Sequence, residues 1–243
     1  MHHAGLLAHS ADGAALCFLE FCHAGGDFHP DITLDCIGMG HGMAAWNAGD
    51  HADVRAILAR SIERLARAGA EFFFCADNTA HIALELPGPA LALPGINIAE
   101  VVADEAARLG GRKVGILGTR FTMEGPVYRR ALSARGIAFE VPEAEDREAV
   151  DRIIFEELVA GVLKPASRDL YIAVIERLKR AGCGTVALVC TEIPLLVAPE
   201  ISPLPTLDST RLLAKAAFET ASGARPLPEW RGGPFGPRAS ATA

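Results

Sequence analysis

One pattern occurs twice in this chain of 243 residues, at positions about half the chain apart. It consists of an amphipathic helix, a glycine, a short apolar strand and a polar tripeptide, and it spans residues 62–79 and again residues 175–192. A glycine directly after the last helical turn is a common end of a helix. The repeat predicts two similar α/β halves, with the tripeptides 77–79 and 190–192 at equivalent strand ends.

Short apolar runs alternate with longer amphipathic stretches along most of the chain. This alternation is typical of parallel sheets covered by helices, so we expect an α/β fold. The expected strands are residues 4–7, 32–36, 71–75, 95–98, 113–117, 139–141, 185–190 and 204–207. The expected helices are residues 53–68, 99–109, 122–135, 147–160, 169–181 and 209–220.

The two tripeptides have equivalent places in the expected fold. Ligands of open parallel sheets bind beyond the carboxyl ends of the strands. Two such ends that face each other across a cleft would present Asp77 from one half and Cys190 from the other. We expect a first α/β domain of residues 1–98 plus 209–225 and a second of residues 99–208, followed by a C-terminal tail, 226–243.

Charge and composition exclude several classes of protein. The chain has 23 basic and 30 acidic residues, a net charge of −7, which argues against a nucleic-acid partner. No run of about 20 apolar residues is present, and the first Lys or Arg is Arg55, so we expect a cytoplasmic protein without a membrane partner. The six cysteines form no CxxC pair, which argues against a structural zinc site.

Each residue at the two strand ends has two interpretations from sequence alone. Cys190 is either a buried apolar residue or a reactive thiol whose pKa is lowered by the helix expected to start near Pro194. Asp77 follows five apolar residues and is either a turn or helix-cap residue or an acid/base group. In the second case, burial beside residues 72–74 would raise its pKa.

The motifs Cys-Ala-Asp-Asn-Thr-Ala-His (75–81) and Cys-Thr-Glu-Ile-Pro-Leu-Leu (190–196) resemble those of the aspartate/glutamate racemase family. This family belongs to the Asp/Glu/hydantoin racemase superfamily of amino-acid racemases that need no cofactor. The resemblance covers most of residues 62–220. Its supporting segments are residues 68–70, 113–123, 125–128 and 207–210.

The resemblance implies two Rossmann-like parallel-sheet domains related by pseudo-twofold symmetry, with the active site in the cleft between them. Family members use one thiol from each domain: one removes the α-proton and the other donates a proton to the opposite face. No cofactor and no metal are therefore expected, and a homodimer is expected because family members are often dimers. The implied catalytic residues are Cys190 and, at the position of the first thiol, Asp77. The implied substrate-binding residues are Ser10, Asn78, Thr79, Thr119, Thr122, Lys164, Thr191 and Glu192.

The chain departs from the family pattern at two places. The residue before Asn-Thr-Ala-His is normally the first thiol, and here it is Asp77, while Cys75 lies deeper in the expected sheet. The first strand normally leads into a Gly-Gly-Met turn that binds the substrate carboxylate, and here it leads into Ala8-His9-Ser10. The carboxylate-binding Arg of this segment is also missing, although seven of the eight His lie in residues 1–51. Candidates to line that part of the pocket are His41, Trp46, Asn47 and His51.

We therefore expect a racemase or isomerase that acts on an amino acid or a related small carboxylate through acid/base chemistry of Asp77 and Cys190. The missing Arg indicates that the substrate is not simply aspartate. A decarboxylase (a lyase) or a hydrolase that uses the same pair on the same scaffold is the alternative, and a non-catalytic ligand-binding relative is a third interpretation.

Overall fold

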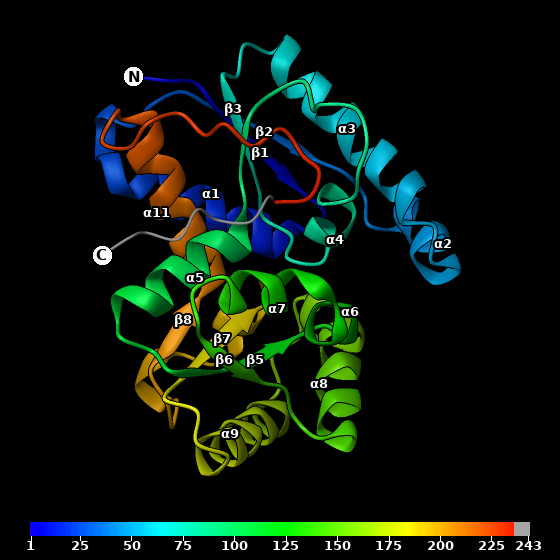
Figure 1. Cartoon of the computed structure of the whole chain (residues 1–243), viewed down its shortest axis with the longest axis vertical. Coiled ribbons are helices and arrows are strands. Elements are labelled where there is room, and N and C mark those ends of the chain that lie inside the picture. Colours follow the sequence, from blue (N-terminus) through cyan, green and yellow to red (C-terminus); the bar gives the residue numbers. More distant parts are fainter. Residues whose placement is uncertain (236–243) are drawn as a thin grey trace.

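The structure is a computed structural model that describes residues 1–235. Two four-stranded parallel sheets form the upper and lower halves of the molecule in Figure 1. The first sheet contains β1 (Ala4–Ala8), β2 (Ile32–Cys36), β3 (Phe72–Cys75) and β4 (Gly95–Ile96). The second contains β5 (Lys113–Gly118), β6 (Ala138–Glu140), β7 (Thr185–Val189) and β8 (Thr206–Asp208). All eight expected strands are present, and the predicted α/β fold with two parallel sheets is confirmed.

The two sheets have the same topology. The strand order is β2-β1-β3-β4 in the first half and β6-β5-β7-β8 in the second, so each strand of one sheet has a counterpart four strands later. This places β3 and β7, which precede the two tripeptides, at the same position in their sheets. The equivalence that the sequence repeat predicted is therefore present in the fold.

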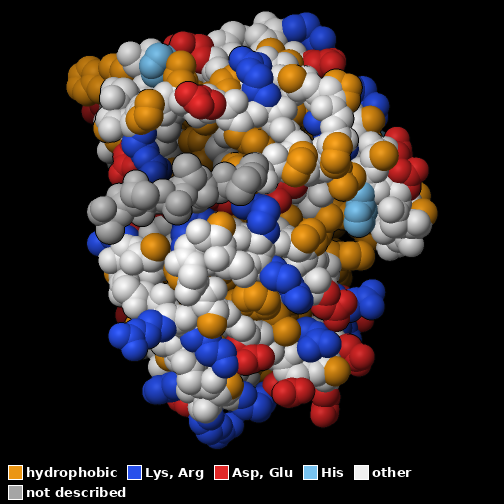
Figure 2. All heavy atoms as spheres, viewed as in Figure 1, with side chains coloured by type: hydrophobic (Ala, Val, Ile, Leu, Met, Phe, Trp, Pro, Cys, Tyr) orange, Lys and Arg blue, Asp and Glu red, His pale blue; other side chains and the backbone are white. Residues whose placement is uncertain are grey.

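Helices cover both sheets. They are α1 (Ala11–Gly25), α2 (Gly40–Ala48), α3 (His51–Arg67), α4 (Ala80–Leu84), α5 (Ile98–Arg108), α6 (Arg120–Glu124), α7 (Pro126–Ser133), α8 (Ala144–Glu156), α9 (Pro165–Arg180), α10 (Ile193–Leu196) and α11 (Ser209–Ala221). The single helix expected at residues 122–135 is instead the pair α6 and α7. Gly125 between them is extended, and Pro126 lacks the N–H needed to continue α6. In Figure 2, hydrophobic side chains lie at the surface where α2 approaches the second half.

The core explains why β1 and β3 are apolar throughout. Both strands are buried along their whole length because helices cover both faces of the first sheet. On one face, Phe74 stacks on Phe21 of α1, with 5.9 Å between the ring centroids. On the other face, Leu7 and Phe73 belong to a larger core that continues into the second half. The ends of β1 and β3 are therefore held between packed layers.

Residues 226–235 pack against the first half. The amide of Gly95, in β4, donates to the carbonyl of Trp230 at 2.7 Å, and the amide of Leu91 donates to the carbonyl of Arg231 at 2.9 Å. The Trp230 ring stacks on His81, with 6.3 Å between the centroids. The remainder of the expected tail, residues 236–243, lies outside the described residues. The domain boundaries expected from the sequence stay a prediction.

Among residues 1–235, none of the helices combines the length and the hydrophobicity that crossing a bilayer requires.

Candidate active site at the facing strand ends

A cavity between the two halves is lined by residues of both tripeptides. Asp77, Asn78 and Thr79 follow β3, and Cys190, Thr191 and Glu192 follow β7. The remaining lining residues are His9, Ser10, Met39, Gly42, Met43, Trp46, Val54, Ile57, Ala76, Thr119, Phe121, Ile154, Phe155, Val159 and Val189. The facing arrangement that the strand positions predicted is present.

Asp77 is hydrogen-bonded through both of its carboxylate oxygens. The Oδ2 atom lies 2.6 Å from Nδ1 of His9, and Oδ1 accepts a hydrogen bond from the Ala80 amide at 3.0 Å. The contact with His9 follows from strand register: Leu7 of β1 pairs with Cys75 of β3, so the residues two positions further along each strand are neighbours. His9 and Asp77 therefore form a pair just beyond the carboxyl ends of the two central strands of the first sheet.

These contacts decide the ionisation of Asp77. Burial favours the neutral acid, but the hydrogen bonds from His9 and from the Ala80 amide outweigh it and hold the pKa of Asp77 below its ordinary value. The expectation that burial would raise this pKa is wrong. The carboxyl group is only partly exposed, yet it has donors that stabilise its charged form.

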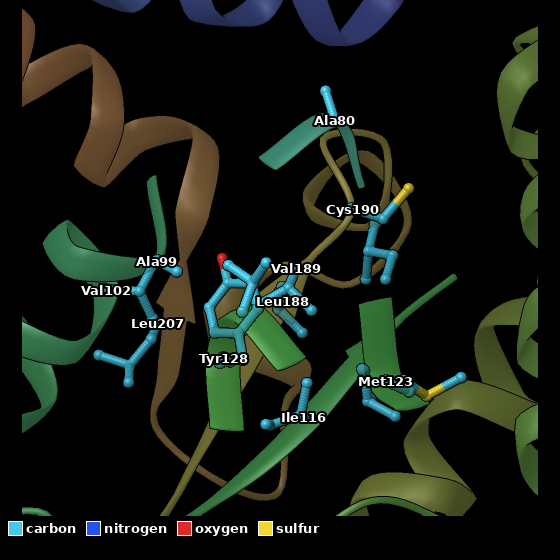
Figure 3. Packing of buried hydrophobic residues seen from close by; sticks show 14 of the residues in the cluster. Ala80, Ala99, Val102, Ile116, Met123, Tyr128, Leu188, Val189, Cys190 and Leu207 are labelled. Atoms are coloured by element: carbon cyan, nitrogen blue, oxygen red, sulfur yellow. The ribbon is translucent and has the colours of Figure 1, made fainter. Parts of the chain in front are cut away.

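Cys190 lies at the end of β7 and is 7% exposed. In Figure 3 it lies at the edge of the core beyond Leu188 and Val189. Its Sγ donates to Oε2 of Glu192 at 3.0 Å. Burial, followed by the negative charge of Glu192, raises the pKa of the Cys190 thiol well above its ordinary value. The expectation that a helix terminus would lower this pKa is wrong, because α10 has four residues and does not offset burial and the carboxylate.

Glu192, which lines the cavity, has a carboxylate oxygen that accepts no hydrogen bond from the described residues. Glu192 is 3% exposed, and its Oε2 accepts from Cys190 and from the Thr191 hydroxyl, the latter at 2.9 Å. Its Oε1 is buried without a hydrogen-bond partner among the described residues. A buried carboxylate oxygen without a partner is costly, so a donor from a bound ligand would satisfy it.

Asn78 connects the two halves. Its Oδ1 accepts a hydrogen bond from the Tyr128 hydroxyl, and its Nδ2 donates to Ser209 at 3.1 Å. Ser209 in turn donates to the carbonyl of Leu188 in β7 at 2.8 Å. Asn78 therefore fixes the first strand end relative to the second.

Three threonines that were expected to bind substrate form one cluster. The Thr79 hydroxyl lies 2.9 Å from those of Thr119 and Thr122, which lie 3.0 Å from each other. Thr79 and Thr119 line the cavity, whereas Thr122 supports them. The cluster brings hydroxyl donors from both halves to the cavity.

The start of α1 closes the cavity near the second tripeptide. Ser10 precedes α1 and lines the cavity. In the first turn, a Cβ atom placed on Gly13 would lie 2.1 Å from the Thr191 hydroxyl oxygen. Only glycine therefore permits α1 to approach Thr191 this closely.

Lys164 is not brought to the cavity. Its side chain is 56% exposed and its Nζ lies 3.1 Å from Glu157. Among the four first-half candidates, Trp46 lines the cavity, whereas His41, Asn47 and His51 do not. His9 received no role from the sequence, although it lies in one of the two departures from the family pattern. The replacement of the usual Gly-Gly-Met turn by Ala8-His9-Ser10 was the sequence signal that could have identified His9.

The cavity is mainly apolar and carries negative charge. The ionisable side chains that line it are His9, Asp77, Cys190 and Glu192, and no Lys or Arg of the described chain is among them. Its apolar wall includes Met43 and Trp46 of α2 and Phe155 of α8. Within residues 1–235, no three His, Cys, Asp or Glu side chains are grouped as a metal ion would require. The arrangement suits proton transfer on a small molecule with an apolar part.

Comparison with known proteins places the chain among amino-acid racemases in sequence and in fold. The family model described as Asp/Glu/Hydantoin racemase matches residues 26–217. The broad specificity amino-acid racemase RacX of Bacillus subtilis (strain 168) is 23% identical over 175 residues, which cover 70% of this chain and 74% of that protein.

Solved structures agree. A putative Asp/Glu racemase from Yersinia pestis is 31% identical, with a TM-score of 0.78 over 91% of this chain and 100% of that chain. PH1733, an aspartate racemase homologue from Pyrococcus horikoshii OT3, is 26% identical, with a TM-score of 0.73 over the same shares. The fold is also similar to that of the glutamate racemase from Francisella tularensis subsp. tularensis SCHU S4 in complex with D-glutamate. That structure is 14% identical, with a TM-score of 0.67 over 96% of this chain and 86% of that chain.

Proposed function

The chain belongs to the Asp/Glu/hydantoin racemase family, and from this premise we propose that it is a cofactor-independent amino-acid racemase in which the Asp77 and Cys190 strand ends transfer the protons. The observation that carries the proposal is the cavity lined by both strand ends, with a carboxylate on one side and a thiol on the other. Racemisation breaks the Cα–H bond on one face and forms it on the other, so it needs one proton-transfer group on each side.

The threonine cluster supports the charged intermediate. Removal of the α-proton leaves negative charge that spreads into the substrate carboxylate. The hydroxyls of Thr79 and Thr119 are fixed by their mutual hydrogen bond at 2.9 Å, and Ser10 also lines the cavity. Donors held in place before the reaction stabilise such charge without the cost of reorganisation.

The lining also indicates the class of amino acid. Oε1 of Glu192 has no partner within residues 1–235 and suits the substrate ammonium group. A second carboxylate on the substrate would meet Asp77 and Glu192 with no Lys or Arg on the cavity wall to offset its charge. Trp46 and Met43 instead offer apolar surface. We therefore place amino acids with apolar side chains ahead of aspartate and glutamate.

Proton exchange in D2O tests the proposal. Each enantiomer of methionine, leucine, phenylalanine, aspartate and glutamate is incubated with the protein, and loss of the α-proton signal is followed by NMR together with the enantiomer ratio. We expect exchange with inversion for the apolar amino acids, and slower exchange, by about tenfold or more, for the acidic ones, because burying an unpaired charge costs several kcal/mol. No exchange with any amino acid would overturn the racemase proposal.

A decarboxylase or hydrolase on the same scaffold is the second candidate. The observation that favours it is the chemical difference between the two strand ends, since a one-directional reaction needs only one proton donor. Such an enzyme would change the mass of its substrate, whereas a racemase leaves the mass unchanged in H2O. Incubation with substituted malonates and with N-acyl amino acids, followed by mass spectrometry, distinguishes the two candidates.

A further inference from the structure

His9 and Asp77 come from two different strands, and the fold makes them one unit. The strand register brings them together, and Nδ1 of His9 lies 2.6 Å from Oδ2 of Asp77. The His9 side chain is 10% exposed and that of Asp77 is 21% exposed, so solvent screens this contact only partly. Both residues line the cavity that also holds Cys190.

The hydrogen bond fixes which nitrogen of His9 can act on a ligand. An ionised carboxylate only accepts hydrogen bonds, so Nδ1 carries the proton that is donated to Asp77. In the neutral imidazole, Nε2 is then the acceptor. Nε2 has no hydrogen-bond partner among the described residues, and the ring is part of the cavity wall.

Asp77 itself is poorly placed to exchange a proton. Oδ2 is bonded to His9, and Oδ1 is bonded to the Ala80 amide at 3.0 Å. Protonation of either oxygen would remove the negative charge that both of these bonds stabilise. The Nε2 atom of His9 is an acceptor that makes no such bond to the described residues.

We infer that His9 is the catalytic acid/base opposite Cys190, and that Asp77 is the positioning residue that holds His9 in the required tautomer and stabilises its charged form. This inference rests on the proposed racemase function and refines the assignment of the proton-transfer group opposite Cys190. An aspartate that orients a histidine is a general means of activating an imidazole for proton transfer.

The proton balance closes with these two groups. Nε2 of neutral His9 takes the α-proton, the electron pair of the Cα–H bond remains on the substrate as the carbanion, and His9 becomes a cation next to the Asp77 carboxylate. The Cys190 thiol gives its S–H proton to the opposite face of Cα and becomes a thiolate. Substrate of the other hand reacts with the form that this turnover leaves: the Cys190 thiolate takes the α-proton, the His9 cation gives its Nε2 proton to the opposite face, and the site returns to its first form. Cys190 is a neutral thiol before the reaction because burial and Glu192 disfavour its charge, so the resting site has one acceptor and one donor.

Substitution of His9 tests the inference in the full-length protein, with methionine, leucine and phenylalanine as probes. We expect His9→Gln to lower α-proton exchange and inversion about 100-fold or more, the size typical of an acid/base group. His29→Gln is the matched control, since His29 is an exposed residue of the same half outside the cavity. Thermal unfolding shows whether each variant is folded, and His9→Asn replaces His9→Gln if the latter is not.

Two further measurements separate catalysis from positioning. If the pair acts as a unit, adding Asp77→Asn to His9→Gln should lower the rate by no more than about twofold, because residues that act together lose their effect together. In His9→Gly, free imidazole in the buffer should restore part of the exchange, which a merely structural histidine would not allow. Histidine NMR should show the Nδ1-protonated form of His9 in the wild type and its loss in Asp77→Ala.

Failure of the His9 inference can be distinguished from failure of the racemase proposal. Wild-type exchange together with unchanged exchange in His9→Gln would overturn this inference and leave the racemase proposal intact. Absence of exchange in the wild type with every probe would overturn both.

Discussion

At the scale of single residues, Cys190 provides one of the two proton-transfer groups of the proposed site. Alanine has no proton to transfer, so Cys190→Ala should lower inversion about 100-fold or more. Exchange without inversion should persist for the enantiomer whose α-proton faces the His9–Asp77 pair, because that side keeps its base. Chiral chromatography and NMR in D2O measure the two effects. Cys36→Ala, at an exposed cysteine, is the control, and undiminished inversion in Cys190→Ala would remove the thiol from the mechanism.

Asp77 allows a second test at this scale. Asp77→Asn keeps the shape of the side chain but not its charge, so proton exchange should fall about 100-fold while substrate is still bound. Asp77→Cys places a thiol at this strand end and should retain more exchange than Asp77→Asn. Isothermal titration with L- and D-leucine measures binding, and D2O exchange measures the chemistry. Full activity in Asp77→Asn would reduce Asp77 to a turn residue.

The residues of the candidate site were largely predictable from the sequence, whereas their electrostatics were not. The repeated tripeptides identified Asp77 and Cys190, and both line the cavity. The pKa directions of both were wrong, because they depend on His9 for Asp77 and on burial and Glu192 for Cys190. The contact between His9 and Asp77 joins residues 68 positions apart, and only the register of β1 against β3 reveals it.

At the scale of elements, the approach of α1 to the second tripeptide depends on Gly13. A Cβ atom there would lie 2.1 Å from the Thr191 hydroxyl oxygen. Gly13→Ala must therefore move the start of α1 away from the cavity, at a cost of about 1–3 kcal/mol in the free energy of unfolding. Because Ser10 moves with it, exchange activity should fall as well.

Urea unfolding and D2O exchange measure the two effects of Gly13→Ala. Gly184→Ala is the matched control, because a Cβ atom at Gly184 meets no heavy atom within 4 Å. Equal stability and equal activity of the two variants would show that α1 is not held against Thr191.

Elements with a clear period were the predictable ones. The central strands β1, β3, β5 and β7 follow mostly apolar runs, and α3 has a strong amphipathic pattern. Helix α2 was not expected because two glycines interrupt its sequence, Gly-His-Gly-Met-Ala-Ala-Trp-Asn-Ala, and glycine lowers helix propensity. It forms nevertheless, packed on α3 and closed by Gly49 at a φ of 69°. The apolar wall that it supplies was therefore missing from the sequence prediction, apart from Trp46.

At the scale of the whole molecule, an ion-pair network joins the two halves. Arg130 of α7 lies 2.7 Å from Glu85, after α4, and also pairs with Glu100 of α5. Arg135 lies 2.8 Å from Glu100. Burial favours the neutral form of Glu100, but the two arginines outweigh it and keep the pKa of Glu100 below its ordinary value. Ionised Glu100 therefore stabilises the folded state.

Acid should remove this stabilisation. A carboxyl group with a lowered folded-state pKa stabilises the fold above its unfolded pKa, about 4.3 for Glu, and loses that effect as the pH falls through the lower folded value. We expect Glu100→Gln to be about 1–3 kcal/mol less stable than the wild type at neutral pH. The difference should shrink toward zero as the pH falls below about 4.

Urea unfolding across that pH range checks this expectation, with Glu176→Gln, at an exposed position of α9, as the control. A difference between Glu100→Gln and the wild type that stays constant with pH would contradict the role of the Glu100 charge.

The unlike chemical groups at the two equivalent strand ends have a thermodynamic consequence. Mirror-image amino acids have equal free energies in water, so an enzyme that interconverts them must have the same kcat/KM for both hands, however different its two sides are. An imidazole on one side and a thiol on the other still make the two directions pass through differently stabilised bound states. The asymmetry must then appear as kcat values that differ between the two enantiomers, with KM values that differ by the same factor. Progress curves started from each pure enantiomer would record this difference.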